Sequence, residues 1–155
     1  MLRVTKLADY GIVLMTYFAS NDEAQMHNAR DLAAEVSLPL PVVSKILKVL
    51  AREGLLISHR GTKGGYSMSR AAKMISVADI IRALEGPIAV TECTDRVHGD
   101  CNLERLCPVR SNWHRINEAI REALEKISLA EMSRPLPTRL VNLTEHSGIQ
   151  AFHVS

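Results

Sequence analysis

The order of helix and strand signals between residues 28 and 69 constrains the fold of this chain more than any other feature. A short helix, a tight proline-containing connection, a longer amphipathic helix and two short strands around a glycine-rich loop follow one another there. Pro41 suits the first turn of the longer helix, and Gly54 is typical of a residue that ends a helix. The predicted helices and strands are 29–36, 41–53, 55–58 and 66–69.

The longer predicted helix has two chemically different sides. Its apolar side is formed by Val43, Ile46, Leu47 and Leu50. The opposite side is polar and basic, as expected for a helix that packs on a core and faces an anionic partner. We predict a fold that is mainly α with a small β wing, in which a winged helix-turn-helix domain precedes a long C-terminal helix. The alternative is a three-helix unit whose hairpin binds another protein.

Basic residues are concentrated in this same part of the chain. Residues 36–75 contain seven lysines and arginines but only one acid, Glu53, so the interval carries +6 on a chain of net charge +2. A local basic zone on a nearly neutral protein is the footprint expected for an anionic polymer. Together with the order of helices and strands, it indicates double-stranded DNA as the partner. A solvated basic face is the alternative. The predicted DNA-binding residues are Ser44, Lys45, Lys48, Arg52, Arg60 and Lys63.

The remaining helices complete a proposed division of the chain. We expect helices at 5–20 and at 77–84, and a long helix from about Val109 to Ile127 whose apolar residues recur at steps of four and three. We also expect Ser128 and Glu131 to cap a final turn after it. The predicted parts are a winged helix-turn-helix domain at 1–86, a cysteine-bearing cluster loop at 87–108, a dimerisation helix at 109–132 and a flexible tail at 133–155.

All three cysteines of the chain, Cys93, Cys101 and Cys107, lie within fifteen residues of one another. Their spacing contains neither the close cysteine pair of zinc fingers nor the dithiol of thioredoxins. Three thiolates on one loop suit an iron–sulfur cluster, because soft irons favour sulfur ligands. Reducible thiols without metal and a structural zinc site are the alternatives. Candidates for a fourth ligand are His98, Asp100, Glu104 and His114.

Several classes of protein are disfavoured by what the chain lacks. We find no phosphate-binding glycine loop, no acid–base pair in a pocket pattern and no dithiol motif, so we expect no enzyme. No apolar run approaches the roughly 20 residues that span a bilayer, and the N-terminus does not resemble a signal peptide. We therefore expect a cytoplasmic protein that binds no membrane.

The chain resembles the winged-helix iron–sulfur regulators that include IscR, the nitric-oxide sensor NsrR and the regulators of SUF-type cluster assembly. The resemblance covers about residues 1–132. Three stretches carry it: Leu-Ala-Asp-Tyr-Gly-Ile at 7–12, the segment 53–66 that ends in Arg-Gly-Thr-Lys-Gly-Gly-Tyr, and the three cysteines before a long helix. The longer gap before Cys101 and the Cys-Pro-Val sequence at 107–109 are most similar to the SUF-regulator branch.

The resemblance implies a homodimer built on the long helix, a palindromic operator and a cluster, [2Fe–2S] or [4Fe–4S], held by the three cysteines. The IscR branch has a histidine ligand three residues after its last cysteine, where this chain has Arg110. The NsrR branch uses an aspartate from the partner's first helix, and Asp9 stands at the matching place. The implied function is control of SUF-type genes by cluster status. Alternatives are a nitric-oxide- or redox-sensing repressor and a zinc-stabilised DNA-binding protein.

Overall fold

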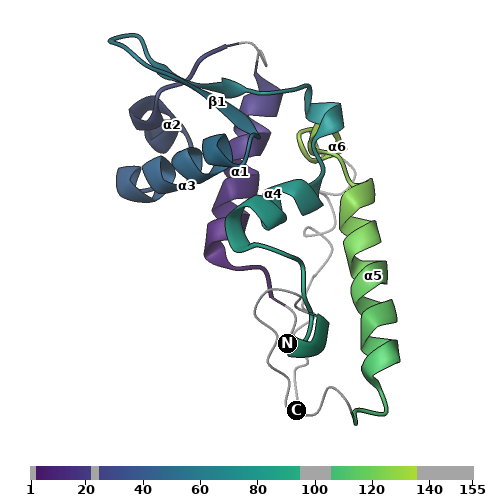
Figure 1. Ribbon diagram of the computed structural model, residues 1–155. Helices are drawn as coiled ribbons and strands as arrows, with labels where there is room; N and C mark the ends of the chain where they lie inside the picture. Colours follow the sequence, from purple (N-terminus) through teal and green to yellow (C-terminus); the bar gives the residue numbers. More distant parts are fainter. Residues whose placement is uncertain (1–2, 22–24, 95–105, 136–155) are drawn as a thin grey trace, which may run out of the picture.

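The computed structural model describes residues 3–21, 25–94 and 106–135. In these residues the chain is mostly helical with one two-stranded antiparallel sheet, so the predicted fold class is confirmed. Figure 1 shows α1–α3 and the sheet at one end of the molecule and α5 along its other side. The elements are α1 (Lys6–Ser20), α2 (Ala29–Glu35), α3 (Leu40–Arg52), β1 (Leu56–His59), β2 (Gly65–Met68), η1 (Ala72–Met74), α4 (Val77–Glu85), η2 (Glu92–Thr94), α5 (Arg110–Lys126) and α6 (Leu129–Met132).

The helices α1, α2, α4 and α6 begin where short polar side chains satisfy their free backbone N–H groups. The Thr5 side chain accepts a hydrogen bond from the backbone N–H of Ala8 at the start of α1. The Asn28 side chain accepts one from the backbone N–H of Asp31 at the start of α2. Ser76 and Asp79 form a reciprocal capping box that starts α4. These local signals explain why the predicted helix starts are within one residue of the observed ones.

One apolar core joins α1, α2, α3, the sheet, α4 and α6. The inner side of α3 is buried as predicted, because its apolar residues face α1 and β1. The fully buried residues of the core include Leu14, Phe18, Leu32, Val43, Ile46, Leu47, Leu50, Ile80 and Leu129. This core fixes the orientation of α3 relative to the hairpin.

The interval 109–132, assigned to the dimerisation helix, contains two helices, and the second is the final turn expected after Ser128. The backbone of Ile127 is extended, and a capping box between Ser128 and Glu131 starts α6. Leu129 is fully buried, and its N–H donates to the carbonyl oxygen of Ile75 at 2.8 Å. The chain therefore leaves α5 and returns to the core of the N-terminal domain. Most of the predicted tail, residues 136–155, lies outside the described residues.

In the described part of the chain, we find no helix with the length and apolar character needed to cross a bilayer.

Candidate DNA-binding surface and cysteine site

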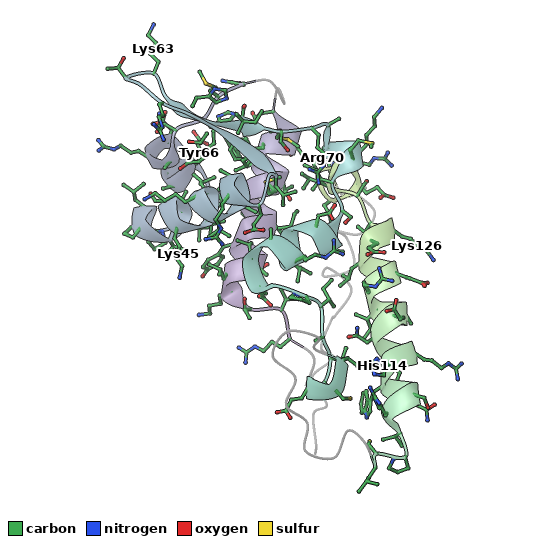
Figure 2. All side chains as sticks on the ribbon, in the orientation of Figure 1. Lys45, Lys63, Tyr66, Arg70, His114 and Lys126 are labelled. Carbon is green, nitrogen blue, oxygen red and sulfur yellow. The ribbon has the colours of Figure 1, made fainter. Side chains whose placement is uncertain are left out.

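The outer side of α3 exposes the predicted basic residues. Lys45, Lys48 and Arg52 are exposed, and Ser44 is half-buried beside them. Lys45 points away from the body of the protein in Figure 2. The Arg52 guanidinium lies 3.0 Å from the Glu53 carboxylate, a pairing between exposed groups that water screens strongly. Four donor side chains are thus presented on one helix of a size that fits a major groove.

The loop between β1 and β2 forms the wing. Arg60 and Lys63 are exposed on it, and Figure 2 shows Lys63 at its tip. Gly61 has a φ of 112°, and a side chain at Gly64 would collide with the backbone of His59. The glycines therefore allow a narrow turn that carries two cations on a thin hairpin.

A bridge that the sequence did not predict anchors the wing. The backbone groups of His27 and Tyr66 exchange two hydrogen bonds of 2.9 Å. The His27 ring packs edge-on against Tyr17 and Phe18 of α1, with ring centroids 5.4 and 5.3 Å away. The wing is thereby joined to the residues just before α2. No short-range signal could have revealed this contact, because 39 positions separate its two residues.

The described parts of the cysteine region, η2 and the start of α5, lie at the other end of the molecule from the wing (Figure 1). Cys93 sits in η2 and Cys107 just before α5, and both side chains are half-buried. The hydroxyl of Thr91 is 3.1 Å from the Cys93 sulfur. Cys101, like the candidates His98, Asp100 and Glu104, lies outside the described residues.

The structure brings no complete ligand set together within the described residues. At residues 3–21, 25–94 and 106–135, no three histidines, cysteines or acids converge on one point. Asp9 is exposed in the first turn of α1. His114 lines a cavity of about 300 Å³ between α5 and the residues around η2. The free thiols of Cys93 and Cys107 are soft donors that fit a soft metal centre.

The apolar seam predicted on α5 is largely uncovered. Val109, Ile116 and Ile127 are 45%, 43% and 40% exposed, and Trp113 and Ile120 are half-buried. The side of α5 that faces the body is different, and its buried residue is Asn117. Asn117 was not predicted from the sequence, although its polar amide stands next to an apolar residue of the seam.

Fold and surface together define a winged-helix DNA-binding regulator. The family described as Rrf2, iron-dependent transcriptional regulator, matches residues 4–135, and the chain belongs to this family. IscR of Escherichia coli is 26% identical over 131 residues, which are 84% of this chain and 80% of that protein. NsrR of Geobacillus kaustophilus is 25% identical over 131 residues, covering 84% and 89%.

A solved structure agrees with these relatives. CymR, the global cysteine regulator of Bacillus subtilis, superposes with a TM-score of 0.66 at 28% identity, over 86% of this chain and 97% of that one. The family and these relatives are transcriptional regulators, not enzymes. DNA binding and control of transcription therefore follow from the family, as the sequence predicted.

Proposed function

We propose that this regulator binds its operator according to the state of an iron–sulfur cluster and controls SUF-type cluster-assembly genes. The observation that carries the proposal is the position of the three cysteines, between the winged domain and α5, in an iron-dependent family. Cys93, Cys101 and Cys107 are the proposed ligands, with Asp9 of a second copy as the fourth. When bound, the cluster is a centre whose state changes with iron supply, oxygen or nitric oxide.

The proposed DNA contacts follow from the exposed surface of α3 and the wing. Ser44, Lys45 and Lys48 would face base edges and phosphates of a major groove, because they lie on the outer side of α3. Arg52, Arg60 and Lys63 would neutralise phosphates of the flanking backbone. A dimer reads a palindrome when its two recognition helices enter successive major grooves, roughly 34 Å apart.

The exposed seam of α5 supports the homodimer. Apolar side chains repeating along one uncovered face of a helix are stabilised when a second such face covers them. Ile116→Glu places a charge in this seam and is expected to convert dimers to monomers in analytical ultracentrifugation. Glu122→Ala, at an exposed position outside the seam, is the matched control. A dimer of unchanged affinity in Ile116→Glu would exclude the seam as the interface.

The cluster is tested on protein purified without air. We expect visible absorption, iron and acid-labile sulfide, all lost in Cys93→Ser while the far-UV helical signal remains. Removal of the cluster should change operator affinity about 5- to 150-fold, the range that a coupling of about 1–3 kcal/mol gives. Absence of iron and sulfide, or equal affinity with and without the cluster, would refute the proposal.

The DNA surface is tested by the salt dependence of operator binding. Lys48→Ala should reduce the slope of log affinity against log salt by about 1, because one phosphate contact is lost. Lys126→Ala at the end of α5 is the matched control, since this exposed lysine lies far from α3 in Figure 2. If the slope of log affinity against log salt were the same in Lys48→Ala and Lys126→Ala, Lys48 would not contact a phosphate.

A second candidate is a redox- or nitric-oxide-sensing repressor of the same family, supported by the similarity to NsrR and CymR. It differs in the signal, so operator release by nitric oxide or by oxidant, with no response to iron supply, would favour it. A colourless protein that contains zinc and binds DNA would instead support the zinc-stabilised alternative.

A further inference from the structure

The buried amide of Asn117 is unusual among the residues of α5. It is 8% exposed, and it is the one buried residue of this helix. Burying an amide costs free energy unless its donor and acceptor both find partners. Both do here, and both partners lie on the segment that leads to Cys93.

The Asn117 side chain holds the backbone of the segment 88–90. Its Nδ2 donates to the carbonyl oxygen of Ile88 at 3.1 Å, and its Oδ1 accepts from the N–H of Val90 at 3.0 Å. An aspartate of the same shape can accept but not donate, and a leucine can do neither. Asparagine is thus the residue of this size that satisfies both backbone groups.

A second buried polar side chain continues this connection to the cysteine. The Thr94 hydroxyl accepts from the N–H groups of Val90 and Thr91, at 3.2 and 3.1 Å, and lies 2.8 Å from the Thr91 carbonyl oxygen to which it donates. Thr94 is buried, so water does not compete for these bonds. The turn that they close carries Cys93, whose sulfur is 3.1 Å from the Thr91 hydroxyl.

We infer that Asn117 is a positioning residue that fixes the Cys93 turn to α5, so that a change at the sulfur is transmitted to this helix. The inference rests on the proposed function for the identity of the signal, a cluster at Cys93. The positioning itself depends only on the hydrogen bonds from Asn117 through Thr94 to the turn.

Thiol reactivity tests the positioning without any metal. In full-length protein with Cys101→Ser and Cys107→Ser, Cys93 is the one remaining thiol, and an aromatic disulfide reagent reports its accessibility. Asn117→Asp should raise the reaction rate about tenfold, because the lost donor and a buried charge favour an open turn. Asn112→Asp, exposed on the same helix, should not. Equal rates in both variants would overturn the inference.

A variant of Thr94 keeps the test decisive if Asn117→Asp does not fold. Thr94→Val removes the hydroxyl at constant shape and should also raise the Cys93 rate about tenfold. Thr94→Ser keeps the hydroxyl and should restore the wild-type rate. A Thr94→Val rate equal to wild type would contradict the connection from Asn117 to the turn.

Hydrogen exchange tests transmission to α5. Anaerobic reconstitution with iron and sulfide should slow amide exchange at 88–94 and in α5 of the wild type. Asn117→Asp should keep the change at 88–94 and lose it in α5. An equal response of α5 in the variant would overturn transmission. If the wild type takes up no iron and sulfide, the proposed cluster fails, while the thiol rates still decide the positioning role.

Discussion

Gly65→Ala tests whether the bridge between His27 and Tyr66 holds the wing in place. A Cβ atom at position 65 would lie 2.6 Å from the carbonyl oxygen of His27 and 3.2 Å from the backbone nitrogen of Asn28. These are backbone atoms next to the start of α2, so they cannot rotate away as the end of a side chain can. We expect the substitution to separate the residues before α2 from β2.

The free energy of this separation follows from the bonds that break. Two backbone hydrogen bonds of 2.9 Å would be lost, each with a net value of about 0.5–1.5 kcal/mol. Alanine offsets about 0.4–1 kcal/mol by restricting the unfolded chain. With the midpoints of these ranges, the free energy of unfolding should fall by about 1.3 kcal/mol in urea denaturation. Thr62→Ala, at an exposed position of the wing, should change it by less than about 0.5 kcal/mol.

DNA binding provides the second measurement on Gly65→Ala. A detached wing still carries Arg60 and Lys63 but no longer holds them at the proposed phosphate contacts. The slope of log affinity against log salt should fall by up to about 1.8, since each phosphate contact contributes about 0.9. Thr62→Ala should keep the wild-type slope. A Gly65→Ala protein with the wild-type urea midpoint and the full salt slope would refute the role of the bridge.

Two further predictions concern α6. Leu129→Ala should lower the free energy of unfolding by about 2–5 kcal/mol, because the Leu129 side chain is fully buried. Leu106→Ala, at a residue that is 86% exposed, should change it by less than about 0.5 kcal/mol. Equal urea midpoints in the two variants would show that α6 does not pack on the core. Hydrogen bonds from the backbone and hydroxyl of Ser128 lower the pKa of Glu131 below its usual 4.5. The stability that the Glu131 carboxylate contributes is therefore present above the pKa of the unfolded chain and is lost as the pH falls through the lower pKa of the folded protein. Glu131→Gln should flatten the acid side of the stability profile, and an unchanged profile would contradict this.

The parts of the fold that depend on neighbouring residues could be predicted from the sequence. The starts of α1, α2 and α4 depend on a side chain and an N–H group three positions later, so Thr5, Asn28 and Ser76 indicate them locally. The two sides of α3 follow from a period of 3.6 residues. The exposure of Lys45, Lys48 and Arg52 could be predicted because these residues lie on the side of α3 opposite its buried residues.

Contacts between distant positions could not be predicted in this way. The apolar spacing along α5 continues to Ile127, yet the helix ends at Lys126. The reason is that the Ile127 carbonyl accepts from the N–H of Val77, and the Leu129 N–H donates to the Ile75 carbonyl. The period of one helix contains no information about these bonds. The bridge of His27 and the partners of Asn117 were missed for the same reason.

The two faces of α5 connect the proposed cysteine site with the proposed dimer contact. Ile116 in the exposed seam and Asn117 on the buried side are consecutive, so their side chains point about 100° apart around the helix. A helix of 17 residues is a rod of about 25 Å, and a displacement imposed at one face moves the other. A change in the Cys93 turn that acts through Asn117 would therefore reach the seam without any intervening segment. The distance between the two α3 helices of the proposed dimer would then depend on how the Cys93 turn packs against α5.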